Sequence, residues 1–86
     1  MTSDSSRRAV LSAVSRILRE ERLKKGLSLA AVAARAGISY QMVGFVEKEE
    51  RNPTLDTLLR IADALEVDFV KIIARASKAE GRKHQK

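Results

Sequence analysis

The chain of 86 residues has no cysteine, no tryptophan, one histidine and one proline, and only 3% of its side chains are aromatic. Without cysteine, disulfides, thiolate nucleophiles and cysteine-ligated metals are excluded. The histidine, His84, lies in a tail rich in lysine and arginine, so a single chain can assemble neither an ordinary zinc site nor a histidine-activated nucleophile. We therefore expect no catalytic residue, no metal and no cofactor, and we expect that the protein is not an enzyme.

Long apolar runs are also missing. No run approaches the roughly 18 residues that a membrane span requires, and the polar start, residues 1–8, lacks the apolar stretch of a signal peptide. We therefore expect a cytoplasmic protein. A chain of this length has room for one compact core, and we expect no separate module for sensing a small molecule.

Positive charge is in excess and is concentrated toward the two ends of the chain. The 17 lysine and arginine residues outnumber the 11 acidic residues, which gives a formal net charge of +6. Such a balance indicates an anionic partner, and nucleic acid and membrane headgroups both fit that description. Of the two, we expect nucleic acid and no membrane.

Apolar side chains recur at three- and four-residue steps, and β-branched alternation is nowhere sustained over the length of a strand. The sequence therefore predicts an all-α fold with five helices. We expect a helix-turn-helix domain over residues 7–76, preceded by a flexible N-terminus over residues 1–6. The last segment, residues 77–86, is basic and has no apolar periodicity, so we expect a disordered tail there.

Two short helices are predicted in the middle of the chain, over residues 29–36 and 40–48. Gly37 can end the first of them, and hydroxyl side chains suited to N-caps stand at Ser28 and Ser39. Because only three residues separate the two helices, the pair is a helix-turn-helix.

A fourth helix is predicted to follow Thr54, its N-cap, and a fifth to open at Asp68. The apolar stripe of the fourth helix, with Ile61 on its flank, consists of Leu55, Leu58, Leu59, Ala62 and Leu65. The fifth helix carries more apolar side chains than one edge of a small bundle would bury. We therefore expect Phe69, Val70 and Ile73 to form a two-fold dimer interface.

Several sequence marks follow one another in a characteristic order. They are Arg22 before Gly26-Leu27-Ser28, Gly37-Ile38-Ser39 in the turn, Glu47 closing the third helix, Pro53, Leu58, Ile61-Ala62-Asp63-Ala64-Leu65 and Val67. With these marks, residues 14 to about 74 resemble the phage-repressor and Cro-like helix-turn-helix family, often called XRE. The resemblance implies a lambda-repressor-like DNA-binding domain. It also implies a transcription regulator that binds double-stranded DNA as a homodimer on a palindromic operator, with the third helix in the major groove.

For the third helix we predict four residues that read bases, namely Tyr40, Gln41, Gly44 and Phe45. Gln41 can pair with the N6 and N7 edge of adenine, and Phe45 can meet a thymine methyl. Gly44 allows close approach, and Tyr40 can donate to a phosphate or pack on a base edge. The alternative for Tyr40 and Phe45 is partial burial against neighbouring helices, and for Gln41 it is an ordinary solvated side chain.

Phosphate contacts are expected from helix N-termini and from basic side chains. The predicted contacts are Arg22, Ser28, Arg35, Ser39, Lys48 and Arg51. Flanking phosphates have further candidates in the first helix and the tail, namely Arg7, Arg8, Arg16, Arg19, Lys24, Lys25, Lys78, Arg82, Lys83 and Lys86. The resemblance also places Arg22 beside Glu47, and we predict a structural ion pair between them. The alternative is two independent surface charges.

Three residues depart from the family pattern. Leu29 stands where the family commonly has a glutamine that touches DNA, Glu49 replaces the usual glycine after the third helix, and Glu50 stands where a basic residue is frequent. The two glutamates would repel a nearby phosphate backbone unless they point to solvent.

These departures leave a second function open, a protein-interaction module on the same fold. Its binding surface would be an apolar patch of Tyr40, Met42 and Phe45 beside the acidic loop, because aromatic anchors with a charged rim suit a protein partner.

Overall fold

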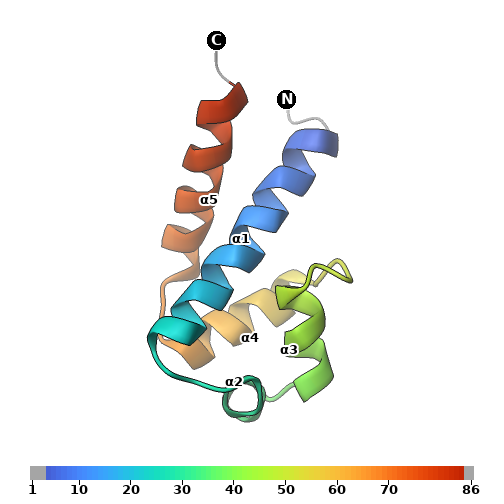
Figure 1. The fold of residues 1–86 in the computed structure, drawn as a ribbon, viewed down its shortest axis with the longest axis vertical. Helices are drawn as coiled ribbons and strands as arrows, with labels where there is room; N and C mark the ends of the chain where they lie inside the picture. The colour runs from blue at the N-terminus through green and yellow to red at the C-terminus, as the bar shows by residue number, and fades with distance from the viewer. Residues whose placement is uncertain (1–3, 85–86) are drawn as a thin grey trace.

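The computed structural model describes residues 4–84, and over this range the chain forms five helices and no strand (Figure 1). The helices are α1 (Asp4–Lys24), α2 (Leu29–Ala36), α3 (Tyr40–Glu47), α4 (Leu55–Leu65) and α5 (Phe69–His84). The predicted all-α fold with five helices is therefore confirmed.

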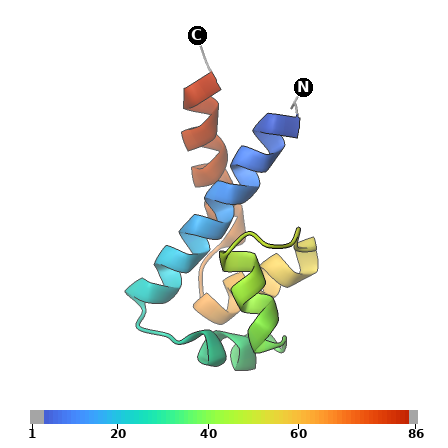
Figure 2. The ribbon, with the colours of Figure 1, turned by 45° about the vertical axis from the view of Figure 1, so that its right-hand side comes forward.

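The long helices α1 and α5 lie side by side, α3 and α4 pack against α1, and α2 lies at one end of the molecule against α3 and α4 (Figures 1 and 2). The buried core is aliphatic. Its largest fully buried side chains come from four of the helices and are Val14, Leu18, Val32, Val43, Val46 and Leu65. The core thus holds α3 and α4 against α1, while α2 packs against α3 and α4 at one end of the molecule.

Side-chain caps start the three short helices. Ser28 Oγ accepts a hydrogen bond from the Ala31 amide at 3.0 Å, and Ser39 Oγ accepts one from the Met42 amide at 3.0 Å. Thr54 caps α4 in the same way. These three predicted N-caps are confirmed, and each satisfies one amide that the first helical turn leaves unpaired.

The turn between α2 and α3 bends the chain by 113°. Gly37 has a φ of 71°, in the left-handed region, and its amide donates to the Ala33 carbonyl at 2.9 Å. None of the helices described is by itself long and apolar enough to cross a membrane, and only the bent pair α2 and α3 meets the length and composition required.

The buried face of α4 differs from the predicted stripe. Leu55 and Leu59 are exposed, whereas Ile61, expected on the flank, is buried. The reason is that α4 packs against α2, α1 and α5 and not against one neighbour. Its buried face is therefore centred on Leu58, Ile61 and Leu65.

The two ends of the described chain are helical where the sequence predicts flexibility. Helix α1 already begins at Asp4, and α5 continues to His84, so a disordered tail beginning at residue 77 is wrong over residues 77–84. Alanine, lysine and arginine have high helix propensity, and Ala76 is fully buried, which anchors α5. Residues 1–3 and 85–86 lie outside the described residues.

Candidate nucleic-acid interface

One face of α3 is open to solvent. Tyr40 has 58% of its surface exposed and Gln41 is exposed, while Val43 and Val46 are buried on the opposite side. A β-carbon built on Gly44 would meet no described atom within 4 Å outside α3 itself. The structure therefore places Tyr40, Gln41 and Gly44 on a face that another molecule can approach closely.

Phe45 and Met42 are less accessible. Met42 is partly buried and packs against the core, and Phe45 is half-buried. The guanidinium of Arg51 covers the Phe45 ring. The apolar patch that a protein-interaction module would use is therefore not a continuous surface, since Met42 belongs to the core and the ring of Phe45 is covered by a charged group.

The N-termini of α2 and α3 both reach the surface. Their N-caps, Ser28 and Ser39, are exposed, and neither first turn contains an acidic residue. The partial positive charge at each helix N-terminus is therefore not compensated locally, which favours an anion such as a phosphate.

Arg22 and Glu47 form an ion pair in the structure. Arg22 Nε lies 2.6 Å from Glu47 Oε2, and Arg22 Nη2 lies 2.9 Å from Glu47 Oε1. The third nitrogen, Arg22 Nη1, donates to the Leu27 carbonyl at 2.9 Å. The side chains are only 12% and 9% exposed, so this bidentate pair fixes the end of α3 against α1. The hydrogen bond from Arg22 to Glu47 raises the pKa of Arg22 above its ordinary value.

A groove of about 420 Å³ lies beside this ion pair, between α1 and α3. Leu29 and Gly44 contribute its less polar part, and Arg19 and Lys48 are exposed residues that line it. Arg19 Nε is 3.9 Å from the nearer carboxylate oxygen of Glu47. Two basic residues of α1 therefore lie next to the open face of α3, the exposed Arg19 and the paired Arg22.

Arg60 links α4 to the end of α2, a contact that the sequence does not predict. Its Nε donates to Asp56 Oδ2 at 2.8 Å, and its Nη1 donates to the Ala36 carbonyl at 3.3 Å. The second bond caps the C-terminus of α2 from α4. The spacing of Asp56 and Arg60, four residues apart on one helix, signals their pairing, but only the fold brings Arg60 to α2.

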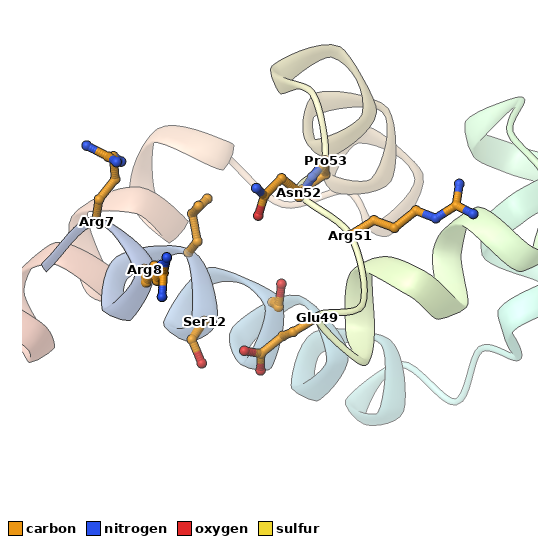
Figure 3. Close-up of a pocket in the computed structure, with 9 residues that line it drawn as sticks. Arg7, Arg8, Ser12, Glu49, Arg51, Asn52 and Pro53 are labelled. Carbon is orange, nitrogen blue, oxygen red and sulfur yellow. The ribbon is translucent and has the colours of Figure 1, made fainter. Parts of the chain in front are cut away.

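The loop after α3 begins with backbone strain. Glu49 has a φ of 60°, a left-handed conformation that non-glycine residues rarely adopt. In Figure 3 its side chain points toward α1, whereas the side chain of Arg51 leaves the loop in the opposite direction, toward α3. Glu49 therefore contributes to a separate cleft of about 330 Å³, lined also by Arg8 and Asn52, and does not cover the open face of α3.

The other predicted residues are divided between surface and core. Arg35 is exposed in the last turn of α2. In α5, Val70 is 74% exposed, but Phe69 and Ile73 are only partly exposed and pack against the core of their own chain. No group of His, Asp or Glu residues in the described part of the chain could hold a metal ion.

Two short capped helices joined at a tight turn, with the second one exposed along one face, define a helix-turn-helix domain. The chain belongs to the family called Helix-turn-helix (HTH_3), whose model matches residues 18–72. It is 38% identical over 61 residues to the HTH-type transcriptional regulator SutR of Escherichia coli K12. That match covers 71% of this chain but only 34% of SutR, so the chain spans about a third of that relative's length.

A second relative has a more similar length. The uncharacterized HTH-type transcriptional regulator y4dJ of Sinorhizobium fredii is 42% identical over 52 residues, which is 60% of this chain and 68% of y4dJ. Among solved structures, the wild-type restriction-modification controller protein C.Esp1396I superimposes with a TM-score of 0.74 at 31% identity, over 87% of this chain and 96% of that one. The tetramer of C.Esp1396I in complex with its natural 35 base-pair operator gives a TM-score of 0.74 at 28% identity, over 83% and 93%.

Proposed function

We propose that this protein is a transcription regulator that binds double-stranded DNA sequence-specifically, with α3 in the major groove. The observation that carries the proposal is the open face of α3, with Tyr40, Gln41 and Gly44 beside two helix N-termini that no acidic residue compensates. The net charge of +6 suits the same partner. The relatives named as transcriptional regulators, and the controller protein seen with its operator, support this function.

In this docking, the exposed face of α3 reads bases. The Gln41 amide pairs with the N6 and N7 edge of an adenine, and Gly44 lets the helix backbone approach the groove. Tyr40, at the start of α3, donates its hydroxyl to a phosphate or packs on a base edge.

Phosphates are held around this face. The helix N-termini at Ser28 and Ser39 offer amides, and Arg35 and Lys48 offer charge. Leu29 supplies no polar contact, so we assign that contact to Arg19 and Lys48 across the groove that Leu29 lines. Arg22 acts mainly on α3, because three of its five N–H donors already bond to Glu47 and Leu27 and its side chain is only 12% exposed.

The protein acts as a homodimer on a palindromic operator. Val70, the exposed member of the α5 set, forms the centre of the dimer contact, flanked by Phe69 and Ile73. Val70→Glu should then sediment as a monomer in sedimentation velocity at micromolar concentration. Because Val70 is exposed in the single chain, the substitution should leave the thermal stability of the monomer itself unchanged. If the wild-type chain already sediments as a monomer, the proposed dimer contact is wrong.

The function is tested by selecting bound duplexes from a random pool and titrating the selected site with salt. We expect two inverted half-sites and an affinity that falls by about 10³-fold or more between 50 and 200 mM salt if six or more phosphates are contacted. Gln41→Ala should relax the preference at one base position by about 1–3 kcal/mol and leave the others unchanged. Absence of duplex binding at low salt would refute the function and favour a protein partner.

A further inference from the structure

Arg51 and Phe45 form one unit in the structure. Arg51 Cζ lies 4.3 Å from the centroid of the Phe45 ring, well within the range of about 6 Å for a cation–π contact. Arg51 is among the residues that line the cleft between the loop and α1, and Figure 3 shows its side chain extending from the loop toward α3. The contact therefore connects the loop between α3 and α4 to the last turn of α3.

The hydrogen-bond donors of Arg51 are available. The residue is exposed, and within the described part of the chain its guanidinium donates no hydrogen bond and has no ion pair. A guanidinium that stacks on an aromatic face retains its five N–H donors for a planar acceptor. The contact also restricts a long side chain before any ligand arrives, so less conformational entropy is lost on binding.

The backbone holds Arg51 near α3 as well. On the N-terminal side of the loop, the Glu50 amide donates to the Phe45 carbonyl at 2.9 Å, which folds the loop back onto the helix. On the other side, Thr54 caps α4. The loop is therefore attached at both ends, which keeps the backbone of Arg51 close to α3.

Phe45 stands four residues after Gln41, so the two side chains lie on the same face of α3, one turn apart. We propose that Arg51 reads a guanine through O6 and N7 in the major groove, and that Phe45 is the positioning residue that orients Arg51. This inference rests on the proposed DNA-binding function and replaces separate roles for Phe45 at a thymine and for Arg51 at a phosphate. One helical turn rises about 5.4 Å and a base-pair step about 3.4 Å, so the guanine lies about one to two base pairs from the base that Gln41 reads.

The experiment measures relative affinities for the selected half-site with each base replaced in turn. The proteins are the wild type, Arg51→Ala, Arg51→Lys, Phe45→Leu and Phe45→Tyr, each checked by circular dichroism. In the wild type we expect a guanine preference of about 10- to 100-fold at the stated place. Arg51→Ala should abolish that preference and leave the preference read by Gln41. Arg51→Lys should lose most of the guanine preference but keep the salt dependence of binding, because lysine retains the charge but cannot pair bidentately.

The Phe45 variants separate positioning from packing. Phe45→Leu keeps an apolar side chain but removes the ring face, so we expect a native melting temperature and a guanine preference reduced at least fivefold. Phe45→Tyr keeps the ring and should retain the preference. A merely structural role for Phe45 predicts no change of preference in Phe45→Leu, and that result would overturn the positioning role. If Phe45→Leu does not fold, Arg51→Ala and Arg51→Lys still decide between a base contact and a phosphate contact, and a loss of the guanine preference in Phe45→Tyr would overturn the positioning role.

Two further outcomes distinguish this inference from the proposed function. If Arg51→Ala weakens binding to every sequence equally and makes the salt dependence shallower, Arg51 contacts a phosphate and the inference is overturned while DNA binding stands. If the wild type binds no duplex at low salt, the proposed function fails first, and the inference fails with it.

Discussion

Removing the carboxylate of Glu47 should destabilise the whole domain. In Glu47→Ala, Arg22 would keep only its hydrogen bond to the Leu27 carbonyl, although its side chain is 12% exposed and fully charged. Stranding one charge of a buried pair costs about 3–5 kcal/mol. A chain of 86 residues has a total stability of about 4–13 kcal/mol at 0.05–0.15 kcal/mol per residue. The loss is therefore a large share of the total, and at 4–8 °C per kcal/mol it lowers the melting temperature by roughly 12–40 °C.

Urea and thermal unfolding followed by circular dichroism measure this loss, and Glu20→Ala is the matched control. Glu20 is an exposed glutamate on α1 for which the structure shows no ion pair among the described residues, so its removal should change the stability by less than about 0.5 kcal/mol. The double variant Arg22→Met/Glu47→Leu should recover most of the loss, because an apolar pair leaves no buried charge. If Glu47→Ala costs less than about 1 kcal/mol, the pair behaves as an exposed one and the reasoning is refuted.

The pH dependence of the Arg22 contribution has a definite sign. The hydrogen bond to Glu47 raises the pKa of Arg22 in the folded state. A group with a raised pKa contributes stability at every pH below its unfolded pKa, and this contribution is lost only as the pH rises past the folded value. The arginine side of the pair should therefore give no pH dependence of unfolding between about pH 6 and 10, and urea unfolding of the wild type and Arg22→Met across this range tests it.

Three smaller changes in folding stability are expected from backbone conformation and helix capping. Glu49→Gly should stabilise the protein by about 0.5–1 kcal/mol, because glycine adopts a φ of 60° without strain. Glu50→Gly is the control and should not stabilise the protein. Equal changes in the melting temperature of the two variants would contradict this prediction. Gly37→Ala should destabilise by about 1–2 kcal/mol, because φ is 71° and the new β-carbon would lie 3.3 Å from Arg60 Nη1; an unchanged melting temperature would show that the turn relaxes. Ser39→Ala should cost about 1 kcal/mol through the lost cap of α3, and Ser77→Ala, at an exposed position, is its control.

The features that the sequence predicts are those with local causes. An N-cap such as Ser39 needs only its own hydroxyl and the amide three residues later, so the sequence alone predicts its role. The position of Arg60 against α2 and the wider buried face of α4 depend on how three helices meet, and no local pattern encodes that. The contact of Arg51 with Phe45 is of the same kind, because a loop must first fold back onto α3.

The exposure of α3 requires support from the rest of the molecule. A helix of eight residues is not stable alone in water, and α2 and α3 are both of this length. The open face of α3 can offer polar and small residues only because its other face is buried through Val43 and Val46 and its end is tied to α1 through Glu47. On the far side, α4 caps α2 through Arg60. The surface that would meet DNA is thus stabilised by residues that do not themselves lie on it, and variants at those residues should lower DNA affinity together with folding stability.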